Sequence, residues 1–521
     1  MKAMPDVLEE QRLTLQAELD SQKTQIERNR LGQFATPTGL AIEILTYAST
    51  LIPADANIAF LDPAIGTGAF YSALRQVFPE KRISEALGFE VDPHYGEPAS
   101  QLWRETGLEI KLGDFTQEQA SLRYNLVICN PPYVRHHHLK NGEKARLQFR
   151  TYSESRMKLS GLAGLYGYFL GLSHPWMSEG AIAGWLIPSE FMDVNYGRAI
   201  KHYLLNRVTL LHIHRFDPRE VQFADALVSS AIVWFRNFPP PEEHVVTFSF
   251  GGTLLSPRSS RDVPAKALAH ESKWTRFPVH ETRRQRTTPV LSDFFQIKRG
   301  LVTGDNQYFV LTASEIAERD LPIELFRPIL PSPRYLPDDE VLADENGLPE
   351  LKKQLFLLDT RLDEEQILGC YPSLSLYLQL GKSRRIHERY ICRHRSPWYS
   401  QEIRPPASIV CTYLGRSDGK NGRPFRFIFN HSAATVANVY LAMYPTPRLA
   451  RALRNDSMLL RRIWQALNQI APEQLLGEGR VYGGGLHKLE PKELANVDAT
   501  AIAALVPDSE FAPAFTQLTF L

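Results

Sequence analysis

Cysteine is scarce in this chain of 521 residues, which has only Cys129, Cys370, Cys392 and Cys411. No two of them have the Cys-x-x-Cys spacing typical of zinc sites and redox-active pairs. The scarcity argues against a disulfide-rich secreted domain and predicts free thiols in a reducing compartment. The run His136-His137-His138 does not supply a metal site, because three successive side chains diverge and cannot share one ion. We therefore assign no metal.

Long apolar runs are also absent. The sequence has no stretch of about 18 apolar residues, so it predicts no membrane span. Residues 1–10 are acidic and lack the basic and apolar stretches of a secretory signal. With 43% hydrophobic and 22% charged residues, the composition is that of an ordinary soluble globular protein. We expect a cytoplasmic protein with no membrane partner.

Neither sign of charge is in excess. The chain has 59 Lys and Arg against 58 Asp and Glu, so its net charge is close to +1. Any contact with nucleic acid must therefore be local. Two basic clusters lie in the second half: Arg283, Arg284, Arg286, Lys298 and Arg299, then Lys382, Arg384, Arg385, Arg389, Arg393 and Arg395, interleaved with Tyr390, Trp398 and Tyr399. Such a mixture suits phosphate contact, although a solvated surface has a similar composition.

The chain is long enough for two domains. Residues 1–30 favour a helical arm. Residues 31–240 alternate apolar strands with helices, which predicts an α/β, Rossmann-like catalytic domain. Three prolines at 239–241 break this alternation, so we place a boundary near residue 240. Residues 241–521 mix short strands and helices and predict a C-terminal α+β domain.

The most informative segment is Asn130-Pro131-Pro132-Tyr133, which follows an apolar strand expected over 126–129. A planar amine is a poor nucleophile because its lone pair is delocalised, and two carbonyl acceptors on its hydrogens localise that pair. The Asn130 side chain and the Pro131 carbonyl can supply these acceptors. Pro131 and Pro132 donate no backbone hydrogen bonds, so the loop cannot satisfy its own carbonyls. Tyr133 offers an aromatic face on which a base can stack.

Three further strand ends suit a nucleotide-like ligand. The strand at 59–62 ends in Asp62, and the turn after it contains Gly66 and Gly68, which allow close backbone approach. The strand at 87–90 ends in Glu90, where a carboxylate can accept hydrogen bonds from ribose hydroxyls. The third strand is followed by Asp114-Phe115, an acceptor for an adenine amine and a ring to lie against the purine. Together these ends predict an S-adenosylmethionine pocket beside an amine-orienting loop.

The order of these motifs resembles that of the gamma-class DNA adenine-N6 methyltransferases of restriction-modification systems, of the TaqI and PstI kind. Residues 31–37, Leu-Gly-Gln-Phe-Ala-Thr-Pro, are similar to the N-terminal motif of that family. Later motifs of the family match residues 165–170, 180–188 and 221–230. In the second half, residues 297–309 predict a strand, a glycine turn and another strand. They resemble the first segment of a target-recognition domain, and residues 483–491 resemble the last.

The resemblance implies a role for each motif residue. The S-adenosylmethionine site would comprise Thr36, which contacts the methionine carboxylate, together with Asp62, Ala64, Gly66, Gly68, Glu90, Asp114 and Phe115. Tyr133 and a second aromatic residue, Phe223, would stack the target base, while Asn130 and Pro131 orient its amine. The implied reaction is methylation of adenine N6 in double-stranded DNA, with base flipping and direct transfer. Any cognate restriction endonuclease would be a separate chain.

Two alternatives remain open from the sequence. Enzymes that methylate guanine N2 in ribosomal RNA or glutamine in release factors share the Asn-Pro-Pro-Tyr loop, so the methyl acceptor could be RNA or protein. The Thr36 segment and the long C-terminal half favour DNA. A chain of another class, a catalytically silent DNA-specificity module, is disfavoured by the presence of Asp62, Glu90 and Asn130.

Overall fold

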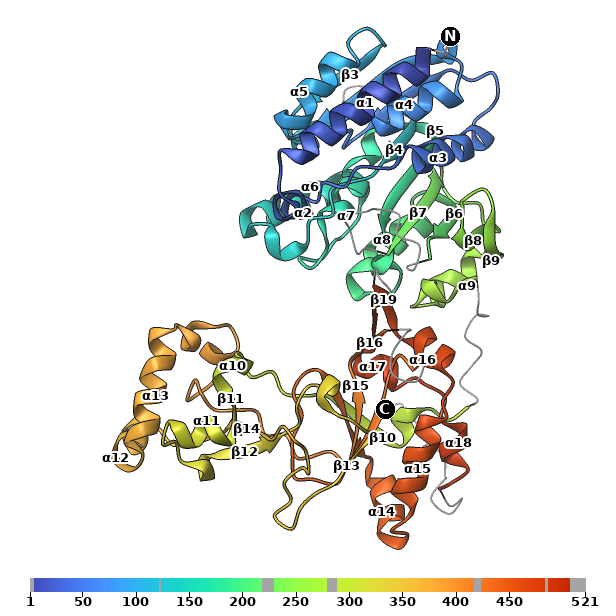
Figure 1. Ribbon diagram of the computed structural model, residues 1–521. Helices are drawn as coiled ribbons and strands as arrows, with labels where there is room; N and C mark the ends of the chain where they lie inside the picture. The colour runs from blue at the N-terminus through green and yellow to red at the C-terminus, as the bar shows by residue number, and fades with distance from the viewer. Residues whose placement is uncertain are drawn as a thin grey trace, which may run out of the picture. The chain divides into compact units, whose positions relative to one another are not determined.

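The computed structural model describes residues 4–120, 123–217, 229–278, 288–416, 423–482 and 486–506. The chain forms two compact units (Figure 1). The first comprises Met1–Arg284 with Tyr482–Gly484, and the second comprises Gln285–Val481 with Gly485–Leu521. Each unit has hydrophobic cores of its own.

A nine-stranded sheet forms the centre of the first unit, in the order β3-β2-β1-β4-β5-β7-β6-β8-β9. Its strands are β1 (Ile58–Asp62), β2 (Ile83–Glu90), β3 (Leu108–Leu112), β4 (Tyr124–Cys129), β5 (Met177–Pro188), β6 (Thr209–Arg215), β7 (Ser230–Arg236), β8 (Val245–Gly252) and β9 (Pro257–Pro264). Strands β3, β2, β1, β4 and β5 run parallel, whereas β7 is antiparallel to β5 and β6. The sheet is therefore mixed, and the five parallel strands share one carboxyl edge.

The parallel half is buried on both faces, as its apolar strands predict. Alternate side chains enter different cores: Phe60, Leu126 and Ile128 pack into one, and Leu61, Val127 and Cys129 into the other. The first core is covered by α3 (Thr38–Leu51), α4 (Ala69–Val77) and α5 (Pro93–Leu102). The second is covered by α6 (Asn141–Ser155), α7 (Leu165–Leu172) and α8 (Arg198–Asn206). This layered arrangement confirms the expected α/β fold class.

The segment that precedes the sheet forms two helices, α1 (Met4–Ser21) and α2 (Gln25–Leu31), in the region where the sequence predicts a helical arm. Helix α1 packs against α4 and α5. The arm is therefore part of the first unit.

The first unit continues well past residue 240, where the sequence places a boundary. Strand β8 pairs in parallel with β6, and β9 pairs with β8, so both extend the same sheet. Helix α9 (Ala265–His270) follows them. The three prolines lie in the connection between β7 and β8. The sequence places the boundary there because β8 pairs with β6, a strand earlier in the chain, and local sequence does not reveal that pairing.

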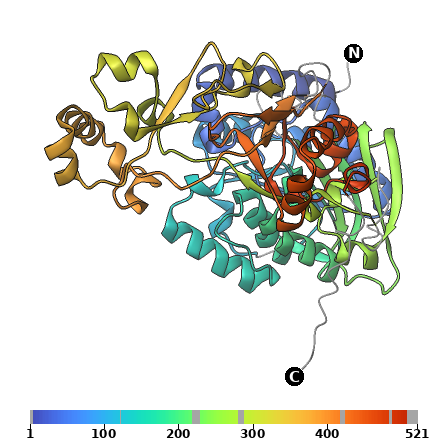
Figure 2. The ribbon, with the colours of Figure 1, turned by 90° about the horizontal axis from the view of Figure 1, so that it is seen from below.

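The second unit contains sheets of order β10-β18-β15-β17-β13, β11-β14-β12 and β16-β20-β19. Its strands are β10 (Phe295–Arg299), β11 (Val310–Thr312), β12 (Phe326–Ile329), β13 (Glu340–Val341), β14 (Leu355–Leu358), β15 (Ile409–Thr412), β16 (Leu414–Arg416), β17 (Phe427–Asn430), β18 (Tyr440–Pro445), β19 (Arg480–Tyr482) and β20 (Leu486–Lys488). Its helices are α10 (Asn306–Phe309), α11 (Ala313–Glu318), α12 (Glu364–Cys370), α13 (Pro372–Ser383), α14 (Pro447–Asn455), α15 (Leu459–Asn468), α16 (Pro472–Glu478), α17 (Pro491–Leu494) and α18 (Thr500–Ala503). Helices α14 and α15, orange to red in Figures 1 and 2, pack on β18 and β17.

One local prediction in the second unit is wrong. Residues 297–309 predict two strands around a glycine turn, but only the first, β10, is present there, and Asn306–Phe309 form the short helix α10. The Asp305 carboxylate accepts hydrogen bonds from Gln307 N at 2.9 Å and Tyr308 N at 3.2 Å. An aspartate that caps the first turn in this way stabilises helix over strand.

Candidate active site

Four of the predicted site residues lie at the ends of four neighbouring strands of the first unit. Asp62 ends β1, Glu90 ends β2, Asp114 follows β3, and Asn130 follows β4. These strands are parallel and adjacent in the order β3-β2-β1-β4. The carboxyl edge of such a sheet is where α/β proteins bind nucleotide-like ligands. The fold therefore brings the four residues to one edge.

The side-chain amide of Asn130 is held in one orientation. Its Nδ2 donates to Phe34 O and to Thr36 Oγ1, at 3.1 Å each. Because a backbone carbonyl can only accept, the first contact identifies the bound atom as the amide nitrogen. Asn130 Oδ1 is buried and has no hydrogen-bond partner among the described residues. An unpaired buried acceptor costs about 1 to 3 kcal/mol, so this atom is a candidate for contact with a substrate hydrogen.

The rest of the loop is fixed by its neighbours. Pro131 is buried, and Pro132 and Tyr133 are half-buried. The Tyr133 hydroxyl donates to Leu186 O of β5 at 3.0 Å, and its ring centroid lies 5.7 Å from that of Phe34. In the part of the chain that the structure describes, no group donates to Pro131 O. The Pro131 carbonyl is thus a second acceptor in the same loop.

Residues 31–37 pack directly on this loop. Gly32 has φ +69°, and a Cβ there would lie 2.4 Å from Tyr133 N, so the close approach requires glycine. Tyr133 N donates to Gly32 O at 3.3 Å. Thr36 is 7% exposed and accepts the Asn130 hydrogen bond across 94 residues of sequence. The two predicted motifs are therefore parts of one site.

The turn between β1 and α4 has the backbone that its glycines predict. Gly66 and Gly68 have φ values of +55° and +90°. A Cβ on Gly68 would lie 2.5 Å from Nε1 of Trp103, whose N–H donates to Thr67 O at 2.9 Å. A Cβ on Gly66 would meet nothing within 4 Å. The turn is packed at Gly68 and open at Gly66, which suits close approach of a ligand to the backbone.

Two of the strand-end acids are held by backbone amides. Asp62 is 1% exposed, and its Oδ1 accepts from Ala64 N at 3.1 Å. Glu90 accepts from Gly66 N at 3.0 Å and from Asp92 N at 2.9 Å. Burial raises the pKa of both carboxyls, that of Asp62 to about 8, and the charge of Glu90 adds to the rise at Asp62. Buried acids with raised pKa values are typical of functional sites.

Asp114 and Phe115 have more internal contacts than their sequence suggests. Asp114 Oδ1 accepts from Thr116 N at 2.9 Å and Thr116 Oγ1 at 2.7 Å, and Oδ2 accepts from Gln117 Nε2 at 2.9 Å. Phe115 is 2% exposed, and its ring lies 5.4, 5.5 and 5.6 Å from those of Phe89, Phe169 and Trp176. Asp114 therefore caps the turn after β3, and Phe115 is part of the core beneath it.

Sequence reasoning missed three arginines that hold these segments. Arg146 and Arg150 of α6 donate to Thr116 O at 3.0 and 2.5 Å and so fix the turn after β3. Arg12 of α1 donates to Thr67 Oγ1 at 3.3 Å, within the glycine turn. All three lie in helices with many charged residues, where nothing in the local sequence distinguishes them from solvated side chains.

Three other predictions concern the second stacking residue, metal binding and membrane spans. Phe223, the second predicted stacking residue, lies outside the described residues. Among those residues, no group of three or more His, Cys, Asp and Glu is placed to hold a metal ion. None of the helices that the structure describes is long and apolar enough to cross a membrane.

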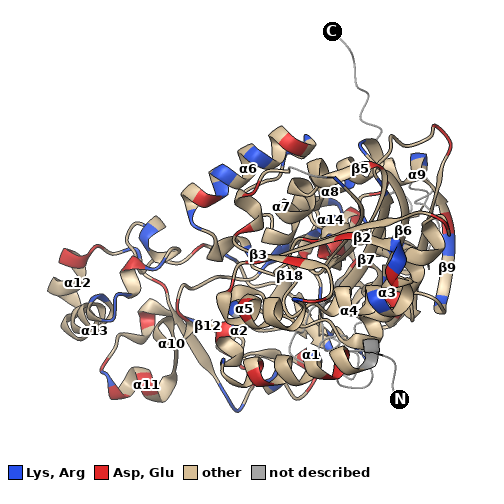
Figure 3. Ribbon diagram, turned by 90° about the horizontal axis from the view of Figure 1, so that it is seen from above, with Lys and Arg blue, Asp and Glu red and all other residues tan. Residues whose placement is uncertain are grey.

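Most side chains of the basic cluster at 382–395 are exposed, but some of them also bind groups of the second unit. Arg389 pairs with Asp305 at 2.7 Å, and Arg395 donates to Thr303 O at 2.9 Å. Arg384 and Arg393 are exposed. In the earlier cluster, Arg283, Arg284 and Arg286 lie outside the described residues. Lys and Arg are interspersed with Asp and Glu in Figure 3, as the net charge implies.

Two family models match the chain. The Eco57I restriction-modification methylase matches residues 84–222, and the C-terminal domain of the type II methyltransferase M.Eco57I matches residues 272–518. The first match contains Glu90, Asp114 and the Asn130 loop. The second covers most of the second unit.

Individual relatives match across both units. The type II methyltransferase M.AccI of Acinetobacter calcoaceticus is 26% identical over 484 residues, 90% of this chain and 85% of the relative. The type II methyltransferase M.XamI of Xanthomonas campestris pv. amaranthicola is 27% identical over 478 residues, 89% of this chain and 84% of the relative. Among solved structures, the type IIL restriction-modification enzyme MmeI, in complex with DNA, supports the fold, with 14% identity, a TM-score of 0.50 and coverage of 84% of this chain and 66% of that one. Across both of its units, the chain is therefore similar to type II restriction-modification methyltransferases.

Proposed function

We propose that this protein transfers a methyl group from S-adenosylmethionine to adenine N6 at a specific site in double-stranded DNA. The observation that carries the proposal is the Asn130 amide. Its nitrogen is bound twice, which leaves a buried, oriented Oδ1 with no donor among the described residues. A planar amine with two hydrogens is a substrate group that satisfies such an acceptor.

The residues of the first unit fit the donor. The open backbone at Gly66 allows close approach, and the Glu90 oxygens retain acceptor capacity for ribose hydroxyls, since each carboxylate oxygen has two lone pairs. The Thr36 hydroxyl accepts from Asn130 and can still donate its proton to a carboxylate. When bound, S-adenosylmethionine supplies an electrophilic methyl group.

The same proposal assigns the remaining positions around the donor. Asp62, at the end of β1, and Ala64, in the turn that follows, would contact the donor. Asp114 retains acceptor capacity for the adenine amine of the donor, because each of its oxygens can accept more than one hydrogen bond. Phe115, which follows Asp114 and is buried, would support the surface against which that adenine packs.

The target amine is activated by the loop. Asn130 Oδ1 and Pro131 O accept the two N6 hydrogens and favour a tetrahedral nitrogen with a localised lone pair. Positive charge develops on the nitrogen during transfer and strengthens both hydrogen bonds. Because N6 lies inside the paired stack, the base must leave the duplex, and Tyr133 and Phe223 stack it outside.

The enzyme supplies no covalent nucleophile in this mechanism. Cys129 immediately precedes Asn130, but it is fully buried, and burial raises the pKa of its thiol well above the ordinary value. A thiol of this kind stays protonated and unreactive. Direct transfer to the amine is the mechanism that these residues support.

We assign recognition of the DNA sequence to the second unit, which begins at Gln285 and not near residue 241. Any cognate restriction endonuclease is then a separate chain in the same cytoplasm. The separate matches of residues 84–222 and 272–518 to two family models support treating the second unit as a domain distinct from the catalytic one.

The test is to map methylation in DNA from a methylation-deficient host that expresses the protein. We expect N6-methyladenine at one short motif, its loss in Asn130→Ala, and its retention in Asn206→Ala, a matched change at an exposed helix position. Donor binding without a mark on DNA would move the methyl acceptor to RNA or protein. Failure to bind S-adenosylmethionine would indicate a silent specificity module.

A further inference from the structure

Helix α1 carries a buried ion pair. Arg12 is 1% exposed and Glu9 is 7% exposed. The guanidinium of Arg12 donates from Nε to Glu9 Oε2 at 2.7 Å and from Nη2 to Glu9 Oε1 at 2.6 Å. The hydrogen bonds from Arg12, and others from Ser72 and Thr38, hold the pKa of Glu9 below its usual value despite its burial. Both side chains are therefore charged and fixed in one geometry.

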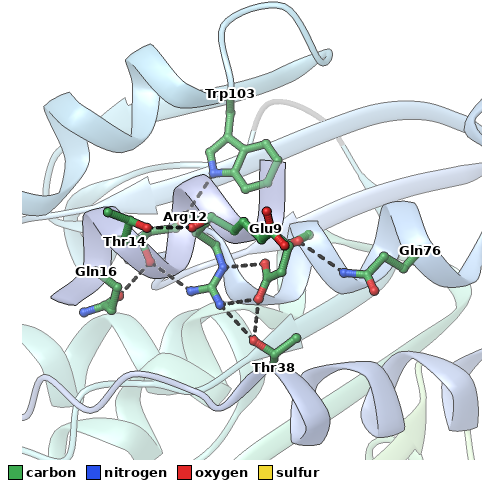
Figure 4. Close-up of polar contacts among 10 residues, drawn as sticks. Glu9, Arg12, Thr14, Gln16, Thr38, Gln76 and Trp103 are labelled. Carbon is green, nitrogen blue, oxygen red and sulfur yellow. Dashed lines mark hydrogen bonds and ion pairs between the residues drawn. The ribbon is translucent and has the colours of Figure 1, made fainter. Parts of the chain in front are cut away.

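The pair contacts two segments of the candidate site at once. Arg12 Nη2 donates to Thr38 Oγ1 at 3.2 Å, two residues after Thr36, and Arg12 Nη1 donates to Thr67 Oγ1 at 3.3 Å, between Gly66 and Gly68. Figure 4 shows the Arg12 guanidinium between Glu9 and Thr38. The Thr38 hydroxyl also donates to Glu9. One guanidinium thus bridges the two segments.

Thr67 is held from both sides. Its hydroxyl donates to Gln16 Oε1 of α1 at 2.6 Å, and its carbonyl accepts from Trp103 Nε1 at 2.9 Å. The residue is 2% exposed. The conformation of the glycine turn therefore depends on α1 on one side and on the indole of Trp103 on the other.

The N-terminal arm and the residues just after it also bind Asp92, next to Glu90, the third position proposed to hold the donor. Lys23 pairs with Asp92, two residues after Glu90, and Gln33 Nε2 donates to Asp92 Oδ2 at 2.7 Å. The Tyr95 hydroxyl donates to Asp20 Oδ1 at 2.8 Å. Residues 9–33 therefore contact the chain at or next to three segments proposed to hold the donor.

Stability alone is a weak explanation for the Arg12–Glu9 pair. Replacing a buried ion pair by apolar residues of similar volume is often neutral or stabilising, because removing two charges from water is unfavourable. What an arginine offers, and a leucine does not, is a rigid planar fork with five donors that can fix several acceptors relative to one another. Here those acceptors belong to different segments.

We infer that Arg12 is a positioning residue for the donor site. Its guanidinium holds the Thr36–Thr38 segment and the Gly66–Gly68 turn at a fixed separation. The inference rests on the proposed function, since it concerns the shape of that same site. Arg12 acts through Thr38 and Thr67, which transmit its position to the backbone next to the donor.

The first experiment is calorimetric titration of S-adenosylmethionine into the full-length protein and two Thr67 variants. Thr67→Val keeps the volume but removes the hydroxyl, and Thr67→Ser keeps the hydroxyl. We expect Thr67→Val to raise Kd about tenfold, as the loss of a hydrogen bond to a charged group does, and Thr67→Ser to restore it. Thr46→Val is the control, because the Thr46 hydroxyl donates to the carbonyl of Ile42 in its own helix.

The second experiment changes the ion pair itself. The double variant Glu9→Gln with Arg12→Gln leaves neither charge buried alone. We expect Kd to rise about tenfold. Adding Thr67→Val should then raise Kd by much less than it does in the parent, because both changes remove the Arg12–Thr67 hydrogen bond, although each also removes one contact of its own, Arg12 to Thr38 and Thr67 to Gln16. At saturating donor, kcat should stay close to that of the parent. Amide exchange at Gly68 in the protein without donor should accelerate in the same variants.

The outcomes separate this inference from the proposed function. A parent protein that does not bind S-adenosylmethionine would overturn both. A parent that binds the donor, together with Thr67→Val and double-variant proteins that bind it equally well, would overturn only the positioning role. Effects of the two changes that add fully would also overturn it, since Arg12 would then not act through Thr67.

Discussion

The strand ends of the first unit and the basic segment 382–395 of the second were both singled out by residue type, yet the structure uses their polar groups differently. At Asn130, the nitrogen is bound twice and the oxygen has no described partner. In the basic segment, Arg395 and Arg389 donate to the protein's own backbone, at Val302 O and Gly304 O. Residue type predicts what chemistry a segment can offer, and its internal hydrogen bonds decide how much remains for a ligand.

The largest expected effect is at Asn130. We expect Asn130→Ala to lower kcat about 10²- to 10³-fold, because it removes an acceptor that we assign to the reacting amine. The Kd for S-adenosylmethionine should change less than about threefold, since we assign the donor to other strand ends. Single-turnover methylation and calorimetry measure the two quantities, with Asn206→Ala as the control. Full activity in Asn130→Ala would show that the Asn130 side chain does not act on the substrate, and the contrast with the arginines of segment 382–395 would then fail.

The first unit offers a second comparison of this kind, between buried histidines that contact other protein groups and exposed histidines. His212 and His214 are buried and contact Ser249 Oγ at 2.7 and 2.8 Å, and burial lowers their pKa values to about 4 and about 3. Since the pKa of an unfolded histidine is about 6.5, the unfolded chain binds more protons below that pH. Their contribution to stability is full above about pH 6.5 and is lost as the pH falls towards 4.

We therefore expect each buried histidine to lower the free energy of unfolding by about 2 kcal/mol between pH 7 and pH 5. Hydrogen exchange of the β6 amides at several pH values measures the change. The double variant His212→Gln with His214→Gln should flatten this dependence, and His202→Gln, at an exposed position, should leave it intact. An unchanged slope in the double variant would assign the acid sensitivity to other groups.

A smaller effect is expected at Arg395, whose donors are used within the second unit. Arg395→Ala leaves Thr303 O and Gln401 Oε1 without this donor and should lower the free energy of unfolding by about 2 kcal/mol. Arg384→Ala, at an exposed position, should change it by less than about 0.5 kcal/mol. Urea unfolding followed by exchange of the β10 amides measures both. Equal effects would contradict the distinction drawn between the two arginines.

The smallest effect concerns two exposed arginines of that segment, Arg384 and Arg393. Arg393 lies over the Tyr390 ring, 5.3 Å from its centroid, and Tyr390 is 68% exposed. We expect Arg384→Ala with Arg393→Ala to reduce the slope of log Kd against log salt for DNA by about 2, one for each lost phosphate contact. Lys81→Ala in the first unit serves as the control. An unchanged slope would exclude this segment from the DNA interface.

The strand ends were predictable because each is a local pattern. An apolar run followed by Asp62, Glu90, Asp114 or Asn130 is visible within six residues, and the parallel order β3-β2-β1-β4 then places the four ends side by side. The glycine turn was predictable for the same reason, since Gly66 and Gly68 adopt the positive φ values that glycine permits.

What the sequence did not reveal depends on contacts between distant residues. Strand β8 extends the first sheet because it pairs with β6, so the proline run was a misleading boundary. Phe115 follows a strand end but packs into the core through Phe89 and Trp176. Glu9 and Arg12 have the spacing of an ordinary surface pair on a helix, and only the partners Thr38 and Thr67 show that they are internal.

The side-chain carbonyl of Asn130, which has no partner among the described residues, also has a consequence for heat resistance. It destabilises the protein without substrate by about 1 to 3 kcal/mol, and an amine that donates to Oδ1 recovers that free energy. Selection for catalysis at this position therefore runs against selection for a stable sheet edge. The protein should reach its highest melting temperature only with a target base engaged, and sequences chosen for heat resistance alone should replace Asn130 first.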